Sequence, residues 1–151
     1  MTSVASHVEL GRRGEQFAVA YLQQAGYRIV ASNFEIPVGR NRVGAPIVVE
    51  IDIVAYDEDV LCFVEVKARS SVWFAEPQVN VDRRKQRQIA RAARAYRRMF
   101  GLENARYRYD VLTVILPDEL QPSISPDIQL FRNYWREEQL KKRAWSDRYY
   151  E

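Results

Sequence analysis

The spacing of apolar residues at the start of the chain predicts a helix. Between positions 7 and 25 the apolar residues recur at the intervals that place them on one face of a helix. Ser6 and Glu9 have the spacing of a capping box, and Gly26 supplies a C-terminal stop. We therefore expect a helix from about His7 to Ala25, with one apolar face turned toward the rest of the protein.

The next part of the chain alternates between strand-like and turn-like segments. Apolar runs over 27–36, 47–56 and 60–67 predict three strands. The short segment Asp57–Asp59 between the last two runs makes those strands an antiparallel hairpin. The segment from Pro37 to Pro46 is rich in turn residues, and we expect an exposed insertion there.

A second helix and two further strands follow. Asp82 can cap a helix from about Arg83 to Phe100. The residues expected on its inner face are Ile89, Ala92, Ala93, Tyr96 and Phe100. Strands are predicted over 107–116 and 128–131, and a polar helix from near Asn133. This order of elements favours an α/β fold in which one mixed sheet is flanked by helices.

Length and composition fit a single domain. The 151 residues, 47% of them hydrophobic, suffice for one buried core and are too few for a second full domain. We place one folded domain at 6–136 and a polar, aromatic tail at 137–151. The single cysteine excludes an internal disulfide framework and a cysteine-based zinc site. No segment has the apolar length of a signal peptide or a membrane span, so we expect a soluble, cytoplasmic protein without a membrane partner.

Positive charge is concentrated in the second predicted helix. The net charge is only +3, but positions 83–98 contain no acidic residue, and such a run of cations attracts polyanions. Four of its arginines would form one stripe opposite the apolar face. That stripe is either a solvated helix face or a contact for nucleic-acid phosphates, and the absence of acids favours the second reading. The candidate nucleic-acid contacts are Arg83, Arg84, Lys85, Arg87, Arg91, Arg94 and Arg98.

The predicted hairpin places two carboxylates face to face. If its turn is Glu58-Asp59, Asp52 lies opposite Glu65, and Glu50 lies opposite Lys67. Two carboxylates this close repel each other unless a cation or a proton lies between them. Oxygen ligands without His or Cys favour Mg²⁺ or Mn²⁺ over zinc. Lys67 could activate a water or stabilise charge on a phosphate. Alternatively, Glu65 and Lys67 could form an ordinary polar face of a half-exposed strand, without a catalytic role.

These residues resemble a known motif. Asp52, followed after twelve residues by Glu65-Val66-Lys67, is similar to the PD-(D/E)xK motif of the restriction-endonuclease-like superfamily. More closely, the chain resembles the YraN family, a group of small bacterial proteins similar in layout to archaeal Holliday-junction resolvases. The segments that carry this resemblance are Gly14-Glu15, Glu50–Ala55, Phe63–Arg69, Lys85 and Tyr109–Val111.

The resemblance implies a restriction-endonuclease-like fold and a set of site residues. Asp52 and Glu65 would be metal ligands, the Val66 carbonyl would supply a further oxygen, and Lys67 would be the catalytic lysine. Glu15 matches the glutamate of the first helix that approaches the metal directly or through water in resolvase-like relatives. From its position alone, Glu15 could also be a solvated helix residue.

Three functions remain open from the sequence. The leading hypothesis is a metal-dependent DNA phosphodiesterase, an endonuclease-like hydrolase that uses Mg²⁺ or Mn²⁺, with branched or structured DNA among its candidate substrates. The alternative is a non-catalytic nucleic-acid-binding module with a nuclease fold. The third is an assembly protein that forms a homodimer. Asp110 could be a second acidic ligand, but an ion pair with a neighbouring arginine is favoured. The aromatic residues near the C-terminus that could stack on bases or pack on a partner are Trp135, Trp145, Tyr149 and Tyr150.

Overall fold

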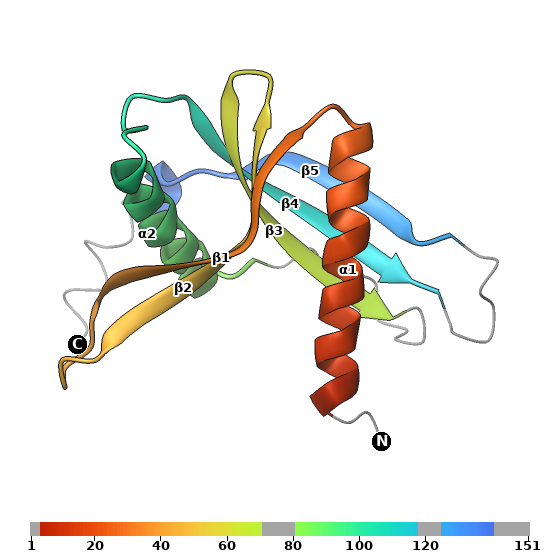
Figure 1. Cartoon of the computed structure of the whole chain (residues 1–151), viewed down its shortest axis with the longest axis horizontal. Coiled ribbons are helices and arrows are strands. Elements are labelled where there is room, and N and C mark those ends of the chain that lie inside the picture. The colour runs from red at the N-terminus through yellow and green to blue at the C-terminus, as the bar shows by residue number, and fades with distance from the viewer. Residues whose placement is uncertain (1–3, 71–80, 118–124, 141–151) are drawn as a thin grey trace.

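The computed structural model describes residues 4–70, 81–117 and 125–140. Its elements are α1 (Val4–Gln24), β1 (Arg28–Arg40), β2 (Pro46–Asp57), β3 (Val60–Ser70), α2 (Arg83–Met99), β4 (Tyr107–Leu116) and β5 (Asp127–Trp135). The strands form one sheet whose order follows the chain, β1-β2-β3-β4-β5 (Figure 1). Neighbouring strands are antiparallel except β3 and β4, which are parallel. This confirms the expected α/β fold with one mixed sheet. Within these ranges no helix combines the length and apolar character needed to span a membrane.

The two helices cover opposite faces of the sheet, each over its own hydrophobic cluster. The cluster under α2 includes Phe63 and Tyr96, and the cluster under α1 includes Leu22 and Val64. Because side chains alternate along a strand, β3 contributes to both clusters, as its sequence pattern predicted. In Figure 1, α2 lies beside β1 and β2, whereas α1 lies in front of β3 and β4.

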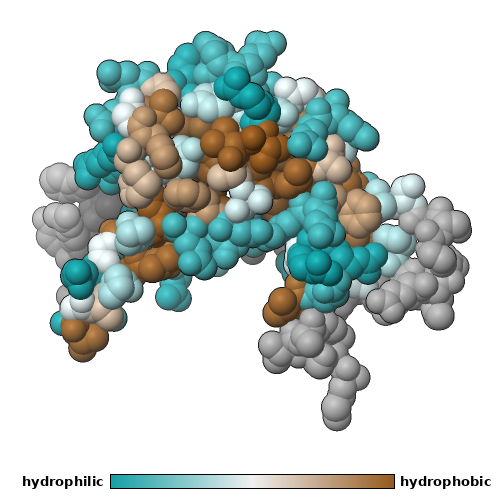
Figure 2. Space-filling model, viewed as in Figure 1, coloured by the Kyte–Doolittle hydropathy of each residue, from teal (hydrophilic) through white to brown (hydrophobic). Residues whose placement is uncertain are grey.

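The sheet divides into two halves below the β2–β3 turn. The two strands pair from the turn as far as Ile53↔Val64, in the register expected from the sequence. Beyond that pair, β2 continues only with β1, while β3 continues with β4 as far as Ser70. The halves spread apart in Figure 1, and the surface is hollowed between the β1–β2 arm and α1, with hydrophilic residues along the rim (Figure 2). We call this opening between β2 and β3 the fork.

The segment from Pro37 to Pro46 is largely exposed, as expected, but half of its residues belong to strands rather than to an insertion. β1 runs to Arg40, and a short turn then leads into β2. A register shift between Pro37 and Gly39 accommodates the irregular residues. Proline is tolerated here because β1 is an edge strand, which leaves one side of its backbone without a strand partner.

Helix α1 starts earlier than its sequence pattern predicts. It begins at Val4, so Ser6 lies inside the helix and the expected capping box is wrong. Glu9 instead pairs with Arg12, at 2.8 Å. The predicted stop is confirmed at Gly26, whose φ of 93° is a conformation that glycine adopts without strain.

The last strand is longer than expected. β5 continues to Trp135, so the helix predicted from Asn133 is wrong, and a helical turn begins only at Glu138. Trp135 is 3% exposed and its ring stacks on Tyr109 at 3.8 Å. It therefore belongs to the core rather than to a surface for bases or a partner. The other aromatic residues of the predicted tail, Trp145, Tyr149 and Tyr150, lie outside the described residues.

Helix α1 passes close to β3 at Gly14. A Cβ atom at this position would lie 2.6 Å from the Cβ of Ala68, well inside van der Waals contact. Gly14→Ala should therefore push α1 outward and destabilise the protein by about 1–3 kcal/mol, measured by urea unfolding. Gly11→Ala is the matched control, because nothing lies within 4 Å of a Cβ there. That variant should gain up to about 1 kcal/mol from helix propensity. Equal stability of the two variants would contradict the close contact.

Candidate metal and nucleic-acid site

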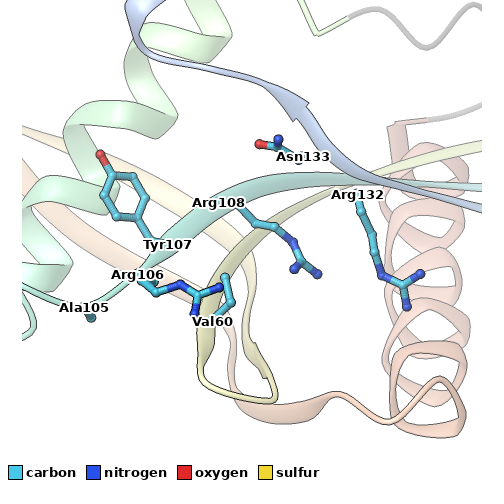
Figure 3. A pocket seen from close by; sticks show the side chains of 7 residues that line it. All are labelled: Val60, Ala105, Arg106, Tyr107, Arg108, Arg132 and Asn133. Atoms are coloured by element: carbon cyan, nitrogen blue, oxygen red, sulfur yellow. The ribbon is translucent and has the colours of Figure 1, made fainter.

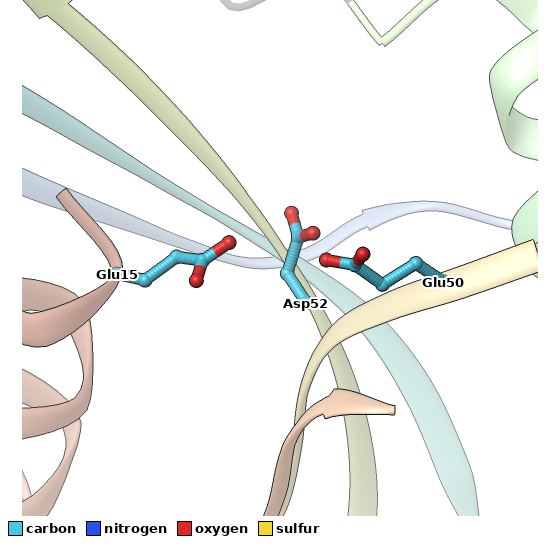
Figure 4. A group of neighbouring side chains, drawn as sticks. All are labelled: Glu15, Glu50 and Asp52. Carbon is cyan, nitrogen blue, oxygen red and sulfur yellow. The ribbon is translucent and has the colours of Figure 1, made fainter. Parts of the chain in front are cut away.

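Three carboxylates meet at the fork. Glu15 comes from α1, Glu50 and Asp52 come from β2, and one ligand oxygen from each lies within 4.8 Å of the others. Figure 4 shows Glu15 and Glu50 pointing toward Asp52 from either side. Glu15 therefore leans over the sheet, as expected. The expected pairing of Glu50 with Lys67 is wrong, because β2 has left β3 at this point and Glu50 pairs with Glu35 of β1.

Asp52 is held by the strand from which β2 departs. Its Oδ2 accepts a hydrogen bond of 2.8 Å from the backbone N–H of Val66. Since Ile53↔Val64 is the last pair of the ladder, this carboxylate takes the place of the next backbone partner. The Val66 carbonyl, which the resemblance assigns as a ligand, stays a prediction.

Glu65 and two lysines complete the polar lining of the fork. The Glu65 side chain is only 8% exposed, and its Oε1 lies 3.9 Å from the Lys67 Nζ and 3.8 Å from the Lys85 Nζ. Lys67 comes from the same strand, as expected. Lys85 comes from the first turn of α2, where the predicted cap Asp82 accepts a 2.8 Å hydrogen bond from the Lys85 N–H. The sequence pattern assigned Lys85 to the nucleic-acid contacts, whereas the structure brings it to the carboxylates.

Burial and mutual repulsion raise the pKa values of the three converging carboxyls, Glu15, Glu50 and Asp52. Burial, followed by the charge of Glu65, raises the pKa of Asp52 to about 7. Burial also raises the pKa of Glu50, and the charges of Asp52 and Glu15 add to this rise. At Glu15, burial raises the pKa, a hydrogen bond from the Asn33 side chain opposes the rise, and Asp52 adds to it. The negative charge of the fork carboxylates therefore exceeds the positive charge of its two lysines, so the fork favours binding of a proton or a cation.

The arginine stripe leads away from the fork along α2. Its members are Arg87, Arg91, Arg94 and Arg98, and all four are exposed. Ile89, Ala93 and Tyr96, on the other side of the helix, are buried, which confirms the amphipathic arrangement. Phe100, also expected on that inner face, is the C-cap residue and is half exposed, but its ring still packs on that of Tyr96, with 4.6 Å between the centroids.

Three basic residues of α2 differ in their contacts and exposure. Arg91 donates a 3.1 Å hydrogen bond to the Val38 carbonyl and so ties α2 to the β1–β2 arm. In the first turn, Arg84 is exposed and Arg83 is half-buried. The exposed cations of this helix therefore begin beside the fork and continue to its far end.

A second polar cluster lies near the start of β4. Asp110 is buried and accepts hydrogen bonds from Tyr27, from Arg108 and from the backbone of Asn133. This confirms the ion pair favoured for Asp110. Beside it, a pocket of about 500 Å³ is lined by Val60, Ala105, Arg106, Tyr107, Arg108, Arg132 and Asn133 (Figure 3). Its arginines pair with Asp57, Asp59 and Asp110, so the positive charge of this pocket is balanced.

The fold and the fork define an α/β protein whose mixed sheet opens at a cluster of carboxylates and lysines. Residues 14–114 match the model of the family described as Uncharacterised protein family UPF0102. The chain belongs to this family, which is the YraN family that its motifs resemble. The matched segment contains every carboxylate and lysine of the fork.

Relatives from several bacteria are similar to this chain over most of its length. The UPF0102 protein of Desulfosudis oleivorans is 42% identical over 106 residues, covering 70% of this chain and 78% of the relative. That of Bacteroides thetaiotaomicron is 43% identical over 112 residues, covering 74% and 84%. That of Geobacter sulfurreducens is 43% identical over 111 residues, covering 72% and 79%.

Asp52→Asn should change how stability depends on pH. Because the pKa of Asp52 is raised in the folded protein, the unfolded chain loses this proton at a lower pH. Between about pH 4 and pH 7 the folded state holds the extra proton, so the stability contributed by this group falls as the pH rises. The variant cannot ionise, and its amide oxygen can still accept the Val66 hydrogen bond. Its stability should fall less over this range and exceed that of the wild type at pH 8.

Urea unfolding in EDTA, repeated across this pH range, measures the effect. Glu103→Gln is the control, because Glu103 is exposed in the turn between α2 and β4. This variant should keep the wild-type pH profile. An Asp52→Asn profile that superimposes on the wild type would show that folding does not disfavour the Asp52 carboxylate.

Proposed function

We propose that this protein is a divalent-metal-dependent phosphodiesterase that cuts DNA. The observation that carries the proposal is the convergence of Glu15, Glu50 and Asp52 within 4.8 Å, next to Glu65 and Lys67. Carboxylates this close, with raised pKa values and too few lysines, form a site that a cation would stabilise. Asp52, Glu65 and Lys67 among these residues form the PD-(D/E)xK pattern of the sequence.

The donor set fits Mg²⁺ or Mn²⁺. All the side chains that converge offer carboxylate oxygens, which hard divalent cations prefer, and none offers the nitrogen or sulfur ligands typical of zinc. Asp52, Glu15 and Glu65 would hold the ion together with the Val66 carbonyl, and Glu50 adds a ligand that the motif did not predict. When bound, the ion would supply positive charge beside a phosphate and make a nearby water more acidic.

The two lysines would act on the phosphate. Glu65 holds the ammonium groups of Lys67 and Lys85 near one carboxylate oxygen, each within 4 Å of its Oε1. Negative charge builds on a phosphodiester as a nucleophile attacks, so preoriented ammonium groups stabilise the transition state more than the substrate. Lys67 is the residue we assign to this role, and Lys85 would support it from α2.

The arginine stripe would hold the DNA backbone. From Arg87 to Arg98 the helix rises about 16 Å, the length of about five nucleotides along one strand of a duplex. The stripe starts two residues after Lys85, so DNA lying along α2 would have one end at the fork. Contacts of this kind bind phosphates without reading sequence, which agrees with a nuclease that recognises the form of its substrate.

Lys67→Ala should separate cutting from binding. The cleavage rate should fall by roughly 100-fold or more, because the lost ammonium acts on the transition state. The affinities for Mn²⁺ and for DNA should stay close to those of the wild type. The experiment is a metal-started nuclease assay on linear, flapped and four-way-junction DNA after removal of metals with EDTA, with calorimetry for Mn²⁺.

Arg106→Ala is the control, since Arg106 is an exposed cation that pairs with Asp59 outside the fork. It should cut like the wild type. Equal cutting by Lys67→Ala and the wild type would indicate another active site or a contaminating nuclease. A wild-type protein that cuts none of these substrates, with either metal, would leave the non-catalytic nucleic-acid-binding module as the better function.

Replacing the stripe should weaken DNA binding equally for all sequences. The variant replaces Arg87, Arg94 and Arg98 with Ser. It keeps Arg91, because the guanidinium of Arg91 donates a hydrogen bond to the Val38 carbonyl. The slope of log affinity against log salt is negative, and each lost phosphate contact should reduce its magnitude by about 0.9 on duplex DNA. Fluorescence anisotropy over a salt series measures the slope. Arg106→Ser should leave it unchanged, and an unchanged slope in the stripe variant would make the stripe a solvated face.

A further inference from the structure

Asn33 has an unusual backbone conformation beside the fork. Its φ is 51°, in the left-handed region that residues other than glycine rarely adopt within a strand. The neighbouring pairs of β1 with β2 are Ser32↔Ile53 and Phe34↔Ile51, so Asn33 lies in register with Asp52. The strand is therefore distorted at the level of the fork carboxylates.

The side chain of Asn33 reaches a second fork carboxylate. It acts as a donor toward Glu15, which lowers the pKa of that carboxyl against the effects of burial and of Asp52. Glu15 comes from α1, whereas Asn33 comes from β1, so the contact joins two elements across the opening. Asp52 is held separately by the Val66 backbone. Each of these two carboxylates thus has a hydrogen-bond donor of its own.

A backbone role alone would favour a different residue. The left-handed conformation costs roughly 1–2 kcal/mol for a residue with a Cβ atom, and glycine avoids this cost. Asparagine tolerates the conformation better than most residues and also provides an amide donor. Asn33 combines a left-handed backbone, register with Asp52 and an amide contact with Glu15. The amide contact explains why this position has asparagine rather than glycine.

We propose that Asn33 is a positioning residue of the fork, whose amide fixes the Glu15 carboxylate beside Asp52. Its importance for metal binding rests on the proposed function. A donor that orients a ligating carboxylate typically changes metal affinity by about 10–100-fold when it is removed. Asn33 would act only through Glu15, and it would touch neither the metal nor the substrate.

Asn33→Gly is the decisive variant, because glycine keeps the left-handed backbone and removes only the amide. Calorimetry with Mn²⁺ on EDTA-stripped protein should show affinity at least about 10-fold weaker than that of the wild type, with a melting temperature close to it. In a Glu15→Gln background the same substitution should have no further effect, since the carboxylate it positions is gone. Asn133→Gly is the matched control. Asn133 has the same φ of 51°, but it binds Asp110 through its backbone N–H.

The outcomes separate this inference from the proposed function. Unchanged Mn²⁺ affinity in Asn33→Gly, or an equal loss in the Glu15→Gln background, would overturn the role of Asn33. Absence of Mn²⁺ binding by the wild type would overturn the metal-dependent function instead. In that case crystal structures of the metal-free wild type and Asn33→Gly decide. A Glu15 carboxylate that moves away from Asp52 in the variant supports the positioning role, and an unmoved carboxylate refutes it.

Discussion

The hydrogen bond from the Val66 backbone to the Asp52 carboxylate is the contact on which the fork depends. A sheet cannot simply separate two strands, because each partly buried N–H left without a partner costs free energy. Here a side chain supplies the missing acceptor at the first position beyond the last ladder pair. β2 can therefore remain with β1 while β3 remains with β4. The opening lets Glu15 of α1 reach Asp52, whereas a continuous sheet would separate these two side chains.

Features set by neighbours along the chain could be predicted from the sequence. The hairpin register follows from the short turn at Glu58. The ladder ends one pair before the expected pairing of Asp52 with Glu65, but Glu65 still lies near enough for its charge to act on Asp52. The start of α2 follows from the cap residue Asp82, and its exposed and buried sides follow from the periodicity of its residues. The ion pair of Asp110 was also expected, because arginine is the common partner of a buried carboxylate.

Features set by competition between distant elements could not be predicted. The alternation of β2 says which side chains share a face, but it does not say where β1 and β4 draw β2 and β3 apart. For that reason Glu50 was paired with Lys67 instead of being grouped with Glu15. Lys85 was part of the family resemblance but was assigned to the nucleic-acid contacts, and only the packing of α2 brings it to Glu65. The left-handed conformation of Asn33 leaves no distinct signal in the sequence.

The agreement between sheet order and chain order bears on how the molecule assembles during synthesis. β1, β2 and β3 are consecutive antiparallel neighbours, so they can pair as soon as they emerge from the ribosome. The parallel partner of β3 follows only after α2, and closing that longer loop is slower. Glu50, Asp52 and Glu65 therefore leave the ribosome, and can be gathered, before Lys85 does. The acidic half of the fork can form ahead of part of its basic half, with cations from the surrounding solution as its first counter-ions.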